Sequence, residues 1–180
     1  MAKSISGKYA IVAILSLALA AVGGGTWYRV RLQQRPARLW GREAVQLILN
    51  GTKVTALRLE PVGEAREKPP REIVGTGGLK LAVVEQTGDL SEVPDLLYIR
   101  RALVHDNSFD WADPLGDRQP KWEYALRFTD GENDTTVLFA PNCTRAKLLE
   151  TGEDASMKFV MPGIEKFLKD QFNAKPNVQL

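Results

Sequence analysis

Histidine and cysteine, which supply many catalytic and transition-metal sites, are almost absent from this chain. Its 180 residues include one histidine, His105, and one cysteine, Cys143. A single cysteine excludes an intramolecular disulfide, and a catalytic zinc site would need a second histidine. The sequence also lacks internal repeats, low-complexity tracts and any set of nucleophile, base and orienting group. We therefore expect no catalytic residue and no cofactor.

Acidic residues are missing from the first 42 positions, and this absence divides the chain. From Glu43 onward the sequence holds 17 lysines and arginines against 22 aspartates and glutamates, so a basic leading part precedes a mildly acidic body. An acidic body is a poor ligand for a polyanion. We therefore expect no nucleic-acid partner; the partners predicted are membrane lipid and an unidentified protein.

The first 28 residues contain the clearest signal in the chain. Residues 9–28, YAIVAILSLALAAVGGGTWY, carry no charge. The segment from Tyr9 to Trp27 would span ~27 Å as a helix, which nearly fills a hydrocarbon core of about 30 Å. Tyr9 stands at one end, and Trp27 and Tyr28 stand at the other, as in the aromatic belts of membrane interfaces. The pattern predicts a single-pass membrane anchor.

A cleaved signal peptide is the alternative interpretation of the same segment. Lys3 and Lys8 would form its basic leading region, and residues 11–20 its apolar region. Small residues at 18–20 or 21–23 would supply the cleavage site. In that case the body would be exported to the cell envelope.

An arginine-rich stem follows the apolar segment. Arg29, Arg31, Arg35 and Arg38 could contact lipid headgroups, where each basic side chain contributes about 1 kcal/mol. Together with Arg42 they outnumber the basic residues before the segment, which favours a body on the cytoplasmic side. A short basic lead is equally typical of an export signal, so the two orientations remain open.

The rest of the chain predicts one α+β domain behind a transmembrane helix. We divide the sequence into the anchor (1–28), the stem (29–42), the domain (43–174) and a polar tail (175–180). Apolar spacing predicts about three helices, at 37–50, at 91–104 and from Pro162 onward. A mainly antiparallel sheet is expected from strands at 53–59, 73–74, 79–84, 121–129, 135–140, 145–149 and 156–161.

Two local patterns refine this domain. Trp122, Tyr124 and Phe128 alternate with more polar residues and should form one buried row on the strand at 121–129. Gly51 follows the last apolar residue of the helix at 37–50, where it fits a left-handed helix stop.

The segment from His105 to Asp117 is the richest candidate site. It places the histidine near Asp106, Asp110 and Asp113, which could together hold a hard or borderline cation. The spacing does not match a calcium-binding loop, because Trp111 stands where a glycine is needed. A surface loop with docked aromatic side chains is the structural alternative, and acid–base chemistry is a further one.

Three other features are better explained structurally. Asp130, Glu132 and Asp134 suit a hairpin turn. Cys143 has no histidine beside it in the sequence to act as a base, so we interpret it as a buried thiol. The run at 75–78, Gly-Thr-Gly-Gly, lacks the lysine and serine of a phosphate-binding loop and predicts a turn.

The order of elements across residues 73–143 resembles small uncharacterised membrane-anchored or exported domains of planctomycete-type bacteria. The likeness depends on SFDWADPLGD and on the hairpin WEYALRF–TVLFAPNC, with Phe109 and Cys143 as the positions that align. Ser108 stands where those domains often carry a cysteine. The resemblance implies a membrane or envelope address and a shape, and it implies no chemistry.

Overall fold

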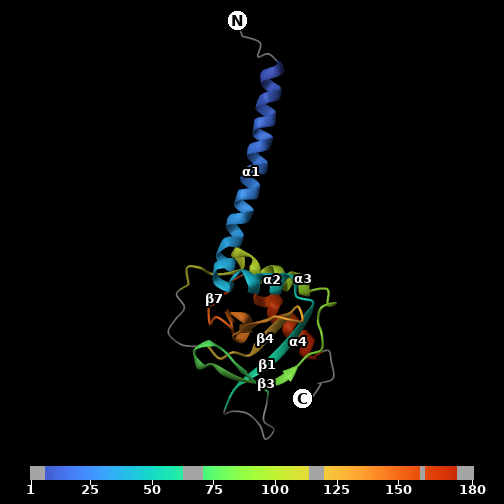
Figure 1. Ribbon diagram of the computed structural model, residues 1–180, viewed down its shortest axis with the longest axis vertical. Coiled ribbons are helices and arrows are strands. Elements are labelled where there is room, and N and C mark those ends of the chain that lie inside the picture. The colour runs from blue at the N-terminus through green and yellow to red at the C-terminus, as the bar shows by residue number, and fades with distance from the viewer. Residues whose placement is uncertain (1–6, 63–70, 114–119, 159–160, 174–180) are drawn as a thin grey trace.

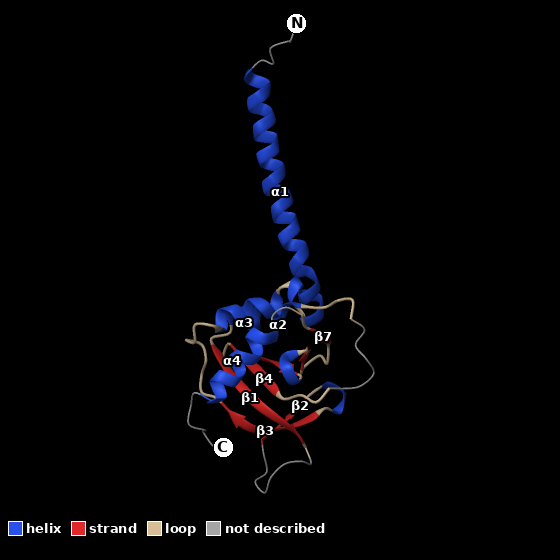
Figure 2. Cartoon of the chain, turned by 180° about the vertical axis from the view of Figure 1, so that it is seen from behind, coloured by secondary structure: helices blue, strands red, loops and turns tan. Residues whose placement is uncertain are grey.

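The computed structural model describes residues 7–62, 71–113, 120–158 and 161–173, without the side chains of residues 7–10, 26–34 and 161. One long helix, α1 (Gly7–Trp40), projects from a body in which shorter helices pack against a sheet (Figure 1). Figure 2 shows the same arrangement from behind, with the strands gathered beneath the helices. The α+β class expected from the sequence is confirmed.

The seven strands within the described residues join one antiparallel sheet in the order β2-β3-β1-β4-β5-β6-β7. β1 is the longest strand and lies between β3 and β4; its register with β3 shifts between Arg58 and Leu59, where a bulge bends the sheet. The strands are β1 (Lys53–Pro61), β2 (Arg71–Val74), β3 (Lys80–Gln86), β4 (Tyr124–Thr129), β5 (Asp134–Phe139), β6 (Arg145–Leu148) and β7 (Asp154–Ser156).

The helices agree with the expected positions and differ at their ends. α2 (Arg42–Asn50), α3 (Leu96–Val104) and α4 (Met161–Asn173) occupy the three expected regions. The start expected at residue 37 is wrong, because residues 37–40 continue α1 and Gly41, at φ 81°, separates α1 from α2. The strand expected at 156–161 is also wrong in extent, since β7 ends at Ser156 and α4 begins at Met161.

Gly51 ends α2 in a different way from the one expected. Its backbone is extended, at φ −52° and ψ 132°, and its amide donates to the Leu47 carbonyl over 2.8 Å. A Cβ at this position would lie 2.6 Å from that carbonyl oxygen. Glycine is therefore required for close approach of the backbone, and a left-handed conformation is not the reason.

Side chains on the two faces of the sheet belong to two different hydrophobic clusters. Residues that alternate along a strand face opposite ways, so Leu126 and Phe128 join the cluster beneath the helices while Ala125 joins the other. Trp122 also belongs to the second cluster, away from Tyr124 and Phe128. The three aromatic side chains are buried, as expected, but they do not share one face, because β4 begins only at Tyr124 and the alternation does not extend to residue 122.

Two buried polar side chains tie the helices together. The Trp40 indole at the end of α1 donates to the Leu103 carbonyl of α3 over 2.7 Å. The Arg100 guanidinium of α3 donates to the Ile48, Leu49 and Gly51 carbonyls at the end of α2. A cation that satisfies the last carbonyls of a helix also opposes the negative end of its dipole. The three helices therefore form one connected layer.

The two ends of α1 have contrasting surroundings. Pro36 and Trp40 are buried in the body, whereas every residue from 11 to 25 is exposed. The exposed set includes large apolar side chains, namely Ile11, Val12, Ile14, Leu15, Leu17, Leu19 and Val22. Over the residues whose placement the structure describes, no helix is long and apolar enough to cross a membrane.

Candidate interaction groove

A groove runs between α2 and the turn that joins β4 to β5. Its volume is about 1030 Å³, and residues near Glu150, just after β6, complete its wall. Ile48 of α2 is buried in the core, and the polar side of the helix, with Arg42, Glu43, Gln46 and Asn50, lines the groove. Ala44 and Leu47 also border the groove.

The groove is strongly acidic. Its lining contains five carboxylates and one basic residue, Arg42; the carboxylates are Glu43, Asp130, Glu132, Asp134 and Glu150. Arg127 pairs with the Asp134 carboxylate, with 3.3 Å between Nε and Oδ2, and so offsets one of these charges from the side of β4. Most of the negative charge therefore faces the open space.

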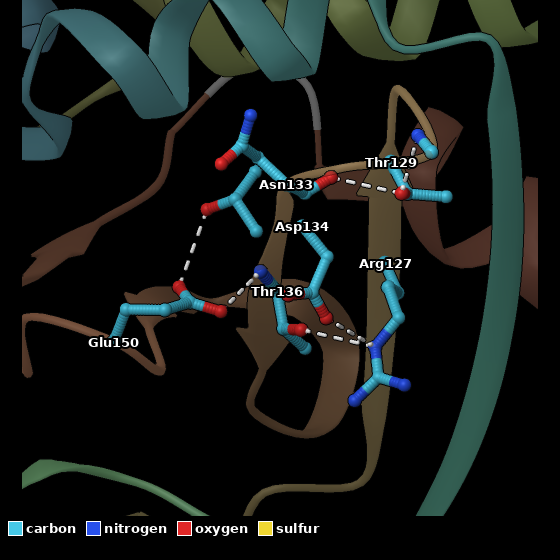
Figure 3. A network of polar contacts seen from close by, with 8 residues as sticks. Arg127, Thr129, Asn133, Asp134, Thr136 and Glu150 are labelled. Carbon is cyan, nitrogen blue, oxygen red and sulfur yellow. Dashed lines mark hydrogen bonds and ion pairs between the residues drawn. The ribbon is translucent and has the colours of Figure 1, made fainter.

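The β4–β5 turn is held in one shape by its own side chains. The Asp130 carboxylate accepts hydrogen bonds from the Glu132 and Asn133 amides at 3.0 and 2.8 Å. These backbone hydrogen bonds, from Asn133 first, lower the pKa of Asp130, so it is ionised at neutral pH. The Thr129 hydroxyl donates to the Asn133 carbonyl and accepts from the Gly131 amide (Figure 3). The expected turn is confirmed over residues 130–133, while Asp134 already begins β5, and the hydrogen bonds to Asp130 fix its carboxylate.

Glu150 reaches the same groove from the neighbouring hairpin. Its carboxylate accepts from the Thr136 amide at 2.8 Å and from the Thr135 hydroxyl at 3.2 Å, as Figure 3 shows. Burial raises the pKa of Glu150, while these donors oppose the rise.

The residues of the His105 segment engage separate partners. The His105 Nδ1 accepts from the Asn107 amide, the Asp110 carboxylate pairs with Lys158 at 2.8 Å, and the Asp113 carboxylate accepts from the Ser156 hydroxyl at 2.6 Å. One Asp106 carboxylate oxygen is buried without a hydrogen-bond partner.

Asp117 lies outside the described residues. Among the residues that are described, no group of three or more histidine, cysteine or acidic side chains is placed to hold a metal ion. The metal site predicted at His105, Asp106, Asp110 and Asp113 therefore stays a prediction, and the described residues form no cluster that supports it.

Cys143 is a buried thiol. It is fully inaccessible, and desolvation raises its pKa to about 12, so the thiol stays protonated at neutral pH. The glycine-rich run begins at Gly75, whose missing side chain allows contact with Leu149, and continues as the short helix η1 (Thr76–Gly78). Both features are structural, as expected.

The residues assigned to the anchor and the lipid headgroups fall partly outside the described side chains. This applies to Tyr9, Trp27, Tyr28, Arg29 and Arg31. Arg38 is exposed, and the Arg35 guanidinium lies 5.9 Å from the centroid of the Trp111 ring.

Sequence reasoning did not find the groove. It recognised the acids at 130–134 as a turn and did not connect them with Glu150 or with α2. The pairing of β5 with β6 brings Glu150 beside Thr136, 14 residues away. The polar residues on one side of α2 were a clue to the groove in the sequence. Only the order of the strands shows that this side faces the β4–β5 turn.

Comparison of the chain with models of known protein families, with curated protein sequences and with solved structures gives no match.

Proposed function

We propose that this chain is a single-pass membrane-anchored domain whose acidic groove binds a positively charged segment of a protein partner. The exposed part of α1 carries the proposal. Leu17 and Leu19 are more than 70% exposed, and no described residue of the body covers them. A helix that exposes so many large apolar side chains is unfavourable in water and favourable in lipid.

The sequence around this part of α1 supports a membrane span. The uncharged run extends beyond the described side chains, from Tyr9 to Tyr28, and basic residues flank it on both sides. Its length as a helix suits the hydrocarbon thickness of a bilayer. The greater number of arginines after the run supports placing the body on the cytoplasmic side.

The groove supports the interaction role. Three of its acids, Asp130, Asp134 and Glu150, are held in place before any partner binds, which reduces the entropy lost on association. A peptide with several lysines or arginines would match the charge of the groove, and attraction between opposite charges would also speed the encounter.

Fractionation of the full-length chain tests the anchor. We expect the protein to remain with membranes after extraction at alkaline pH. Recovery as a free protein with a new N-terminus near residue 21 or 24 would instead establish the cleaved signal peptide and an exported body.

Labelling tests the orientation. Because Cys143 is buried and protonated, a Val84→Cys variant offers one reactive thiol, at an exposed position of β3. An impermeant thiol reagent should label it only after cell lysis. Labelling in intact cells would place the body outside.

Peptide binding tests the groove. The full-length protein in detergent should bind a lysine-rich peptide more tightly than a neutral peptide of equal length, and salt should weaken the binding. Glu43→Gln combined with Glu132→Gln should weaken it about twofold to fivefold per charge. The control combines Glu72→Gln with Glu92→Gln, at exposed sites outside the groove, and should leave peptide binding unchanged. Equal loss in both double variants would contradict a groove-specific interaction.

A further inference from the structure

We propose that the end of the body from which α1 projects lies against an anionic lipid surface, through a face made by Arg35, Leu97, Tyr98, Arg101 and Trp111. We call this the stem face. The inference rests on the proposed membrane anchor and adds a second contact with the same bilayer. In both views α2 and α3 lie at the end of the body where α1 emerges, and β3 lies toward the opposite end (Figures 1 and 2).

The helices at this end of the body are rich in exposed arginine, and the acidic groove opens beside α2. The described C-terminal part of α1 (residues 35–40), α2 and α3 contain exposed Arg35, Arg38, Arg42 and Arg101 against Glu43, while exposed Asp95 precedes α3 and exposed Asp113 follows Trp111. The body as a whole carries more acids than bases. A basic surface next to the anchor is complementary to anionic headgroups, whose attraction acts only within about one Debye length of the membrane.

The apolar residues of the stem face have the character of an interfacial contact. Leu97 and Tyr98 are more than half exposed, one helical turn before Arg101, and one edge of the Tyr98 ring lies against Gly163 of α4. Trp111 is 36% exposed, packs on buried Phe109 and donates through its indole to the Asp106 carbonyl. Tryptophan and tyrosine favour the headgroup level, where one end of the ring is apolar and the other is hydrated.

The length of the stem brings this face within reach of the lipid. From Tyr28, the end of the uncharged run, to buried Pro36 is eight helical steps, or ~12 Å. The headgroup layer occupies about 5–7 Å of that distance. Arginine side chains cross the remainder, and a helix tilt of about 20° moves one side of the face closer. Arg35, which stacks over Trp111, lies on this path and connects the stem to the face.

Depth-dependent quenching in vesicles tests the proposal on the full chain. An environment-sensitive fluorophore is attached at Leu97→Cys, and in a matched variant at Val84→Cys on β3; buried Cys143 does not compete for the reagent. The protein is reconstituted into vesicles of phosphatidylcholine with phosphatidylserine, containing lipids brominated near the headgroup. We expect strong quenching at residue 97 and little at residue 84. Replacing phosphatidylserine by phosphatidylcholine should reduce the quenching at 97.

Substitution of the arginines of the stem face provides a second test of the proposal. Arg35→Gln and Arg101→Gln should each lower the occupancy of the lipid-contacting orientation about fivefold. Lys80→Gln, at an exposed position of β3, should leave the occupancy of the lipid-contacting orientation unchanged.

Three results would overturn the inference. Equally weak quenching at both positions, with the chain retained in the vesicles, would refute the stem face and leave the anchor intact. A fluorophore at 97 that is shielded from water but not quenched by brominated lipid would mean that protein covers the face. Failure of the chain to enter vesicles would refute the anchor and the inference together.

Discussion

The two ends of α1 show how one helix can be built for two different surroundings. At residues 36–40 the helix contributes Pro36 and the Trp40 indole to the core of the body, and at residues 11–25 every residue is exposed. The same backbone geometry continues through both. The contrast teaches that side chains alone decide which part of this helix stabilises the fold and which part sets its location.

Trp40→Ala should have the largest effect on the buried end. Removing a buried indole leaves a cavity and an unpaired Leu103 carbonyl, so the free energy of unfolding should fall by about 3–5 kcal/mol. Chemical denaturation in detergent measures this. Leu17→Ala is the matched control and should change the value by less than about 0.5 kcal/mol. A comparable loss in both variants would show that the exposed end also packs against protein.

Leu17→Arg should act on the exposed end and spare the fold. An arginine near the centre of a membrane span raises the insertion free energy by about 2.5–3.5 kcal/mol. We expect much of the protein to leave the membrane fraction, while the unfolding curve of the body stays unchanged. If the variant remains fully in the membrane, α1 does not cross it at this residue.

Trp40→Phe separates packing from hydrogen bonding at the buried end. The ring is largely kept and the indole N–H is lost, so the Leu103 carbonyl loses its partner and stability should fall by about 1–2 kcal/mol. Denaturation under the same conditions as for Trp40→Ala gives the comparison. A loss as large as that of Trp40→Ala would mean that the hydrogen bond dominates over the packed volume.

Arg35→Ala should have the smallest effect, at the junction of the two ends. The guanidinium lies over a partly exposed Trp111 ring, and such a contact is worth about 0.5–1 kcal/mol. We expect a loss in this range and a change in Trp111 fluorescence. Arg38→Ala, also exposed on the same helix but in no ring contact that the structure describes, serves as the control.

The fold was largely predictable because apolar periodicity is a local signal. Leu96, Ile99 and Leu103 repeat at helical spacing and are all buried. Element ends were less predictable, since the start of β4 at Tyr124 depends on pairing with β5 and not on the residues before it. The groove could not be predicted, because Glu150 and Asp130 come together only through the order of the strands.

The bond from Trp40 to α3 has a mechanical consequence. A force pulling on α1 along its axis would enter the body through the indole and the Leu103 carbonyl, and would then spread through Arg100 to the end of α2. The strand ladder lies beyond this helical layer and would bear load only after it. Pro36 donates no hydrogen bond to the preceding turn, so bending would concentrate there. A load on the stem would therefore reach the helices of this layer before it reached the sheet.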